Sequence, residues 1–495
     1  MDKQIIFSFG QNNKLPTLTS EEFFAVALQN LSPENERLEE LLHLNQTHSV
    51  GVPANALAFS FDPSTRFSNV YAFATTGVHL VKDGSLTSLA SLTASTKRWQ
   101  PVLWKDSVYF TRPEYQLSKA FGPTISSVDT SSNGSSFTFS ARYMLSAHDR
   151  LFCGNTFVNG TNNSTEVRWS DVYNPEVWEI SESTEADKFS LSVSDLEITG
   201  LALHHNTVLI FSSRSVWMAS YEGLPKIYSF SPLFSDTGCA YHYSCVSVGD
   251  VTYFIAKHGV YKIENYQLVE VGGDIWPTLR TALVGQTEVY ATADEEHKLI
   301  YWNVGSNTYV YNYDEKRWAV YNFTYTTALL HIPGSIRRTK VIDDCSEIID
   351  SVSTIIDDGL GTSSASQLDF LARGNFLYQP DTGTAQTYAC KLTLPFAFFG
   401  DLWSEKEVNE VKLIFEQVGT PTISLTTKYK DSHSDTEKTE TSTLSSFTDE
   451  AVFKLRNVRA AKLMAFELNF NQTSTNYVTR LIGLSVRIQN DEPEK

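Results

Sequence analysis

One short hairpin pattern recurs along the chain and constrains its fold more than any other feature. It reads "FATTGVHLV" from Phe73, "FSSRSVWMA" from Phe211, "FIAKHGVYKI" from Phe254 and "FLARGNFLYQ" from Phe370. Each copy is a strand, a tight polar turn and a second strand that opens on an apolar or aromatic residue. This arrangement is the signature of a β-hairpin.

The spacing of these hairpins predicts how they are assembled. Aromatic anchors follow one another at intervals of 37, 42, 59, 43 and 48 residues, and they are Phe73, Phe110, Phe152, Phe211, Phe254 and Trp302. One four-stranded propeller blade uses about 40 to 50 residues, and it cannot bury both faces without neighbouring blades. We therefore expect a β-propeller of six or seven blades over residues 50–384, forming a closed disc that surrounds a passage.

The two ends of the chain have different patterns. "TSEE" at Thr19 and "SPEN" at Ser32 resemble helix starts, so residues 1–49 are predicted to be a helical segment with helices over 21–30 and 33–44. Within 385–495, six runs alternate at period two and predict a β-sandwich. Residues 335–367 are interpreted as a long acidic loop. The predicted fold class is mostly β.

Composition limits the possible functions. The 495 residues carry a net charge of -18, which argues against reading a nucleic-acid sequence through clustered Lys and Arg. No apolar run is long enough for a signal peptide or a membrane span, so we expect synthesis in the cytoplasm. The cysteines form no CxxC pair and are expected to be buried free thiols: Cys153, Cys239, Cys245, Cys345 and Cys390.

The most distinctive local motif is "VRWSDVYNPEVW", which follows a polar insertion, "VNGTNNST", at a hairpin tip. We expect Asp171 and Asn174 to cap a turn that Pro175 fixes. Trp169 and Trp178 are expected to clamp that turn from either side.

A search for catalytic and ligand-binding motifs finds no phosphate loop, zinc spacing or nucleophile signature, and we predict no cofactor and no enzyme activity. His204 and His205 are adjacent on a predicted strand, which would direct their rings to opposite faces. The acid pairs at Asp343 and Asp357 could bind a divalent cation or simply be solvated. The basic cluster that could contact phosphates or a neighbouring subunit is Arg337, Arg338 and Lys340.

The order of the motifs adds a resemblance to a family. An SD-x-x-NP-x-x-W turn, a Trp-bearing hairpin, a Gly-Cys step and a Gly-Val-Tyr hairpin follow one another between residues 150 and 264. This succession resembles the nozzle or hub proteins of short-tailed phages, including tail tubular protein B and the packaged-DNA stabilisation proteins. The residues that carry it are Trp169, Ser170, Asp171, Asn174, Pro175, Trp178, Trp217, Gly238, Gly259 and Tyr261.

The resemblance implies a structural role in the virion tail. Such a protein forms a hexameric ring below the portal and its adaptor and above the fibres or needle. Genomic DNA passes through the lumen of the ring without sequence-specific binding, and the ring helps to retain packaged DNA. Two alternatives stay open: a cytosolic propeller that acts as an interaction scaffold, and a carbohydrate-active propeller enzyme of a virion, which needs two opposed carboxylates.

Overall fold

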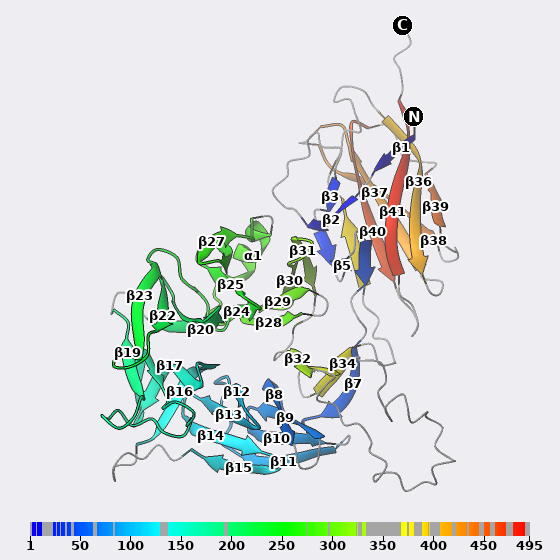
Figure 1. Ribbon diagram of the computed structural model, residues 1–495. Coiled ribbons are helices and arrows are strands. Elements are labelled where there is room, and N and C mark those ends of the chain that lie inside the picture. The colour runs from blue at the N-terminus through cyan, green and yellow to red at the C-terminus, as the bar shows by residue number, and fades with distance from the viewer. Residues whose placement is uncertain are drawn as a thin grey trace, which may run out of the picture.

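The structure is a computed structural model of the chain (Figure 1). It describes residues 2–5, 7–11, 23–25, 27–29, 31–34, 37–40, 44–62, 67–82, 85–128, 137–192, 197–273, 275–295, 298–322, 324, 329–332, 368–373, 376–380, 389–394, 396, 406–417, 422–432, 435–444, 450–455, 461–471 and 479–490.

The first three of the sheets that form the disc are called blades 1, 2 and 3. Each has four antiparallel strands that lie side by side in sequence order. Blade 1 is β8 (Ala54–Asp62), β9 (Phe67–Ala74), β10 (Gly77–Lys82) and β11 (Ser85–Ser91). Blade 2 is β12 (Gln100–Trp104), β13 (Ser107–Arg112), β14 (Tyr115–Phe121) and β15 (Thr124–Ser127). Blade 3 is β16 (Phe139–Ala147), β17 (Arg150–Val158), β18 (Thr161–Trp169) and β19 (Asp187–Ser190).

Blades 4, 5 and 6 repeat the same arrangement. Blade 4 is β20 (Ile198–His204), β21 (Thr207–Ser212), β22 (Val216–Tyr221) and β23 (Tyr228–Phe234). Blade 5 is β24 (Val246–Val248), β25 (Val251–Ala256), β26 (Gly259–Glu264) and β27 (Gln267–Glu270). Blade 6 is β28 (Tyr290–Asp294), β29 (Leu299–Val304), β30 (Asn307–Asn312) and β31 (Arg317–Tyr321), and it follows helix α1 (Trp276–Ala282).

Blade 7 is built from both ends of the propeller sequence. Its order is β32 (Leu329–Ile332), β33 (Leu368–Arg373), β34 (Phe376–Pro380) and then β7 (Leu44–Ser49), the strand that precedes blade 1 in the sequence. The first strand of every blade contacts the first strand of the next, and β32 contacts β8. The ring is therefore a closed seven-bladed propeller, within the predicted range of six or seven blades.

The recurring aromatic residues pack neighbouring blades against each other. Phe73 of blade 1 lies 5.0 Å from Phe110 of blade 2 between ring centroids, and Phe211 of blade 4 lies 5.1 Å from Phe254 of blade 5. These four side chains are completely buried. The predicted propeller fold, in which stacking covers the face of each blade, is confirmed.

The predicted C-terminal β-sandwich is also confirmed, and N-terminal strands complete both of its sheets (Figure 1). One sheet has the order β39 (Glu450–Lys454), β36 (Lys406–Gln417), β41 (Thr479–Asn490), β6 (Arg37–Glu40) and β5 (Leu31–Glu34), with β1 (Asp2–Ile5) also paired to β41. The other has the order β38 (Lys438–Leu444), β37 (Thr422–Lys430), β40 (Leu463–Asn471), β35 (Ala389–Thr393) and β4 (Ala27–Gln29).

Strand β4 also joins the sandwich to the propeller. It pairs with β35 on one side and, through Gln29 and Val320, with β31 of blade 6 on the other. One hydrophobic core runs across this junction, because Tyr301 and Tyr321 of blade 6 belong to the same buried cluster as Leu392. The predicted domain limit at residues 384 and 385 falls within 381–388, outside the described residues.

The prediction of N-terminal helices over 21–30 and 33–44 was wrong. These stretches contain β3 (Phe23–Ala25), β4, β5 and β6, and β3 pairs with β2 (Phe7–Gln11). The helix-start signals are weak local preferences, and pairing with strands that lie hundreds of residues away overrides them. In the part of the chain that the structure describes, α1 is the one helix.

Candidate functional site

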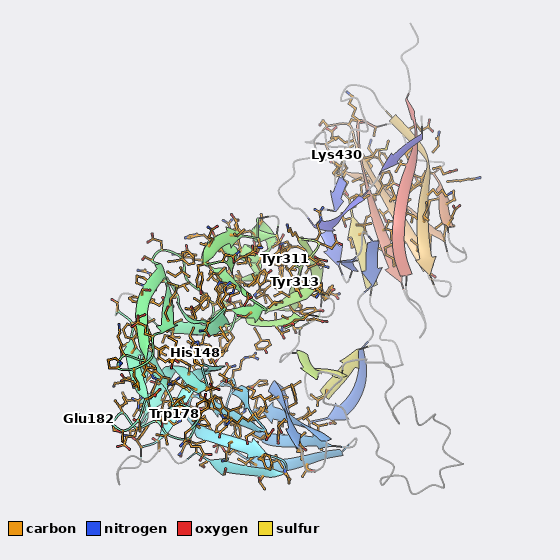
Figure 2. The ribbon with its side chains drawn as sticks, viewed as in Figure 1. His148, Trp178, Glu182, Tyr311, Tyr313 and Lys430 are labelled. Carbon is orange, nitrogen blue, oxygen red and sulfur yellow. The ribbon has the colours of Figure 1, made fainter. Side chains whose placement is uncertain are left out.

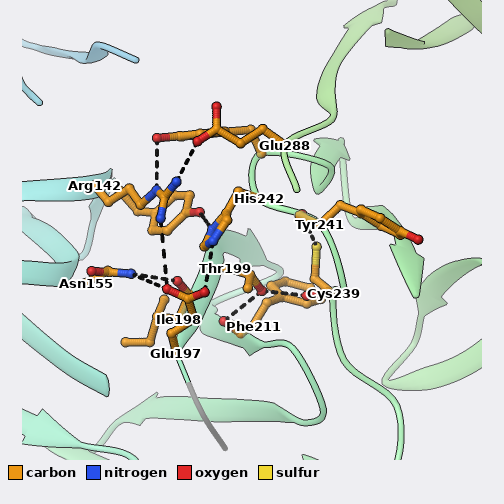
Figure 3. A network of polar contacts seen from close by, with 12 residues as sticks. Arg142, Asn155, Glu197, Ile198, Thr199, Phe211, Cys239, Tyr241, His242 and Glu288 are labelled. Atoms are coloured by element: carbon orange, nitrogen blue, oxygen red, sulfur yellow. Dashed lines mark hydrogen bonds and ion pairs between the residues drawn. The ribbon is translucent and has the colours of Figure 1, made fainter. Parts of the chain in front are cut away.

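A group of polar and aromatic side chains meets at the axis of the propeller, and we call it the axial network (Figure 3). Its members lie on the innermost strands of successive blades or just before them. They are Arg98 before β12, Arg142 and Tyr143 on β16, Glu197 before β20, His242 and Tyr243 before β24, and Glu288 and Tyr290 at the start of blade 6. Because the first strands of all blades surround the axis, these positions converge at one face of the disc.

Arg142 connects four blades through its guanidinium group. Its Nη2 lies 2.6 Å from Glu288 Oε1, its Nη1 lies 3.9 Å from Glu197 Oε2, and its Nε donates to Tyr243 Oη at 3.3 Å. Burial lowers the pKa of Arg142, but the nearby Tyr143 and Tyr243 hydroxyls and the Glu288 carboxylate outweigh this effect and raise the pKa. The guanidinium therefore stays charged and holds both carboxylates.

His242 bridges a second pair of groups in the network. Its Nδ1 is hydrogen-bonded with the hydroxyl of buried Tyr143, and its Nε2 lies 3.1 Å from Glu197 Oε1. The hydrogen bond from His242 lowers the pKa of Glu197, burial opposes it, and Arg142 contributes to the lowering. Burial raises the pKa of Tyr143. Glu197 is therefore ionised and Tyr143 neutral at pH 7.

Arg98 makes further contacts across the axis. It precedes blade 2, yet its guanidinium lies 4.1 Å from the centroid of the Tyr290 ring in blade 6. Its Nη1 donates to the Asn55 carbonyl oxygen of blade 1 at 2.9 Å. Side chains from opposite blades thus touch across the axis, and the expectation that a single disc surrounds an open passage was wrong at this face.

The axial network consists of charged groups that pair with one another and so connect the blades. Glu197 and Glu288 both contact the same cation, and the lowered pKa of Glu197 is the opposite of what a general acid of a glycosidase needs. Within the described ranges, no group of three or more His, Cys, Asp or Glu side chains is placed to hold a metal ion. These charges stabilise the contacts between blades.

The SD-x-x-NP-x-x-W motif forms a compact turn after β18. The Asp171 backbone N–H donates to the Val177 carbonyl at 2.9 Å, and Asp171 Oδ1 accepts from the Glu185 N–H at 2.9 Å. Asn174 Oδ1 accepts from the Glu176 N–H at 3.2 Å. Pro175 lies between these contacts and supplies a carbonyl to Trp178 Nε1 at 2.9 Å.

The two tryptophans of the motif belong to different hydrophobic clusters. Trp169 lies 5.1 Å from Tyr228 of blade 4, and its Nε1 donates to the Glu185 carbonyl at 2.9 Å. Trp178 (Figure 2) lies 4.8 Å from Phe139 of blade 3. Ser170 Oγ accepts from the Leu151 N–H at 3.0 Å, which ties the start of the turn to β17.

The other motif residues lie in blades 4 and 5 and have structural roles. Trp217 packs against Phe189 at 6.0 Å, and Tyr261 packs against Phe254 at 6.2 Å. A Cβ on Gly238 would lie 2.3 Å from the Ser212 carbonyl oxygen, and one on Gly259 would lie 3.1 Å from the Tyr261 ring. The structure does not bring these residues together into one site.

Of the remaining predictions, the one on the two histidines was wrong, and the others concern residues that the structure does not describe. The rings of His204 and His205 do not point to opposite faces, because His205 adopts a left-handed turn conformation with a φ of 50° and the ring centroids lie 4.6 Å apart. Outside the described residues lie Arg337, Arg338, Lys340, Asp343 and Asp357.

A groove on the rim of the disc, which we call the rim groove, lies between residues 180–189 and 224–230 and has a volume of about 600 Å³. Two of its apolar side chains are unusually exposed: Leu224 at 77% and Ile180 at 46%. Glu182, at the outer margin of blade 3 in Figure 2, also lines it. In the turn that follows β18, Tyr173 is 66% exposed with a φ of 55°, a conformation that bulky residues rarely adopt.

Neither the axial network nor the rim groove was predicted from the sequence. Arg98, Arg142, Glu197, His242 and Glu288 are spread over 190 positions and match no motif. The available signal was positional, because each residue lies on the first strand of its blade or within four positions before it. Aligning the blades on those strands would have gathered the polar side chains near the propeller axis.

No family model matches the chain, and no curated protein matches it. Among solved structures, it is similar to the WD40 β-propeller domain of Doa1, with 8% identity and a TM-score of 0.39 over 68% of this chain and 96% of that one. It is also similar to the WD40 domain of Neurospora crassa Pan2, with 9% identity and a TM-score of 0.37 over 69% of this chain and 96% of that one. These similarities concern the fold alone.

A third similar structure covers more of this chain. It is the extracellular domain of the putative hybrid two-component system BT3049 from B. thetaiotaomicron, with 8% identity and a TM-score of 0.43 over 88% of this chain and 56% of that one. The strand pairing of the chain itself defines its class, a β-propeller protein with an appended β-sandwich. Over the described ranges, no helix has the length and apolar character needed to cross a membrane.

Proposed function

We propose that this protein works by binding other protein chains and that it catalyses no reaction. The observation that carries the proposal is a contrast between the axis and the rim of the disc. Charged groups at the axis pair with one another, whereas large apolar side chains are exposed along the rim groove. Exposed apolar groups beside a groove and rimmed by polar residues are typical of protein-binding surfaces.

The partner we propose for the rim groove is a neighbouring copy of this chain. The groove lies on the side of the disc, between the outer parts of blades 3 and 4, so a copy bound there would stand beside the first one. A contact between two different surfaces closes into a ring when the rotation between copies divides a full turn. Leu224 and Ile180 are the apolar anchors of this contact.

The ring that we propose is the hexameric hub or nozzle of a short-tailed phage tail, in the virion, with the adaptor above and fibres or needle below. The support is the ordered motif series that ends in the Gly-Val-Tyr hairpin of blade 5. The filled propeller axis adds a geometric condition: the genome would pass through the lumen between six copies, where an acidic wall limits the Lys and Arg contacts that grip a duplex.

A cytosolic interaction scaffold is the second candidate. The rim groove supports it equally, since an apolar groove can hold a segment of another protein as well as a second copy. The two candidates differ in what occupies the groove. A scaffold stays a monomer in the absence of its partner, whereas a ring subunit assembles with itself.

The experiment is to measure the mass of the purified chain by light scattering after size exclusion, and to image it by negative stain with and without the adaptor ring. The test variant is Leu224→Asp, and the matched control is Val284→Asp, because Val284 is 78% exposed and lies away from the groove, after α1. We expect the wild type and the control to form six-fold rings. The test variant should need a protein concentration at least tenfold higher to assemble.

The outcomes separate the proposals. If Leu224→Asp does not change assembly, the rim groove is not the contact between copies, but the proposal of a ring still stands. A wild type that stays monomeric with and without the adaptor contradicts the tail hub and leaves the scaffold. Turnover of a host polysaccharide by the purified chain contradicts both.

A further inference from the structure

The rim groove is built by two connections that are longer than their counterparts in blades 2, 5 and 6. Between the third and fourth strands, blades 2 and 5 each have two residues and blade 6 has four. Blade 4 has six residues there (222–227), and blade 3 has seventeen (170–186). Both long connections line the groove. An ordered connection of more than about 12–15 residues is uncommon in a compact domain and usually serves binding or catalysis.

We call residues 170–186 the arm, and it begins with the SD-x-x-NP-x-x-W motif. Near its end the arm forms a turn that is closed by a hydrogen bond from Thr184 Oγ1 to the Glu179 carbonyl at 2.6 Å. Ile180 and Glu182 lie within this turn, have exposed side chains and line the groove. The position of the turn therefore sets the position of one wall of the groove.

Glu185 ties this turn to the body of blade 3 through three of its groups. Its N–H donates to Asp171 Oδ1 at 2.9 Å, its carbonyl accepts from Trp169 Nε1 at 2.9 Å, and its carboxylate pairs with Arg150. The Arg150 side chain is 1% exposed, so salt screens this ion pair less than it screens pairs on the surface. Trp169 and Asp171 both belong to the sequence "VRWSDVYNPEVW". That sequence therefore fixes the far end of the arm as well as its own turn.

These contacts give the groove its shape before a partner binds. Neither Asp171 nor Arg150 lines the groove, so both act on it through Glu185, which does. A loop that is ordered only during association lowers the affinity, because ordering it costs conformational entropy. A wall that is already fixed avoids that cost. It also keeps Ile180 at a constant distance from Leu224, the apolar anchor on the other wall.

We propose that the arm is the element of the rim groove that receives the neighbouring copy, and that Asp171 and Arg150 are positioning residues that hold Ile180 in place for this contact. The proposal rests on the proposed function, because its occupant is the second copy of the chain. It gives the SD-x-x-NP-x-x-W motif a role in assembly, which is to set the shape of a docking wall.

The test compares two substitutions that remove the same charge from the full chain. Asp171→Ala deletes the oxygen that accepts from the Glu185 N–H, whereas Asp171→Asn keeps an oxygen that can accept this bond. The backbone hydrogen bond from Asp171 to Val177 stays in both variants. Hydrogen exchange of the arm peptides is followed by mass spectrometry below the concentration at which the chain assembles, and assembly is followed by light scattering.

We expect the arm of Asp171→Ala to exchange at least tenfold faster than the arm of the wild type, while peptides of blades 2 and 5 keep their rates. This variant should also need a concentration at least tenfold higher to assemble, and Asp171→Asn should match the wild type in both measurements. Where Asp171→Ala fails to fold, exchange of the wild-type arm decides the matter. A wild-type arm that exchanges as fast as an unfolded peptide has no fixed shape and overturns the proposal.

The other outcomes separate this proposal from the proposed function. If Asp171→Ala loosens the arm but leaves assembly unchanged, the arm does not receive the neighbouring copy, and the ring still stands. If Asp171→Ala leaves the exchange rates unchanged, or if Asp171→Asn loosens the arm as much, the bond to Glu185 does not hold the arm and the proposal is overturned. A wild type that stays monomeric with and without the adaptor ring overturns both proposals.

Discussion

At the scale of single residues, the protein places its buried charges so that each serves two or three partners. Arg142 is the clearest case, because one guanidinium contacts groups from three other blades. Such a group costs little while its partners are present, since hydrogen bonds and opposite charges replace the water that it has lost. Removing it takes away the cation that Glu197 and Glu288 share.

We expect Arg142→Ala to lower the free energy of unfolding by about 1–3 kcal/mol, because it breaks charge-assisted hydrogen bonds at a largely buried position. The control is Lys119→Ala, which breaks the ion pair with Glu176 on a surface where both side chains are about one third exposed. Exposed pairs contribute about 0–1 kcal/mol. Urea unfolding at pH 7 measures both, and equal effects of the two variants would contradict the role given to Arg142.

A second residue-scale prediction concerns His204, whose side chain is completely buried and whose Nδ1 has no hydrogen-bond partner. Burial, and then the proximity of His205, lowers the pKa of His204 below its ordinary 6.5. The unfolded chain therefore takes up the proton first, and stability falls as the pH drops below 6.5 towards the folded pKa, by up to about 1.4 kcal/mol per pH unit.

Replacing the group tests this prediction. His204→Phe should show a shallower loss of stability between pH 6.5 and pH 5 than the wild type, measured as the urea midpoint at each pH. The control is His258→Phe, an exposed position where the slope should not change. A wild type and a His204→Phe variant with parallel profiles would show that His204 does not titrate differently in the two states.

At the scale of secondary-structure elements, the sequence predicts best where neighbours in the chain are also neighbours in space. The hairpins at Phe73, Phe211 and Phe254 are local, and their anchors lie between blades as expected. Strand β4 was assigned to a helix because its partners, β31 and β35, lie about 290 and 360 residues further along. No local pattern records such a pairing.

The same distinction explains what was predicted of the candidate site. The turn around Asp171 and Asn174 could be predicted from the sequence, because its contacts join residues a few positions apart. The axial network could not be predicted, since Arg98 meets Tyr290 only after the blades have closed into a ring. His205 shows a smaller version of the problem, because one left-handed residue reverses the direction of a ring.

At the scale of the whole molecule, the N-terminal residues hold three parts together. Strand β7 completes blade 7, β4 joins blade 6 to the sandwich, and β1, β5 and β6 extend one sandwich sheet. A sheet edge that is paired within the molecule cannot pair with another chain. The propeller and the sandwich therefore share strands that come from the first 49 residues.

A pair of truncations tests how the ring is closed. Removal of residues 1–43 keeps β7, whereas removal of residues 1–49 deletes it. We expect only the longer deletion to open blade 7, because β34 then loses its partner strand. Limited trypsin digestion should cut after Arg373, in the β33–β34 hairpin, at least tenfold faster in the longer deletion than in the shorter one. Equal rates in the two would mean that β7 does not hold the blade.

The shared N-terminal strands also have a consequence for biosynthesis. A ribosome makes β7 and β4 first, but β34 and β35, with which they pair, emerge more than 300 residues later. At about 5–20 residues per second, translation leaves those early strands unpaired for tens of seconds. Individual blades can form on the growing chain, whereas ring closure must wait for β34. A product that is terminated before β34 has an open disc that is exposed to proteases and to aggregation.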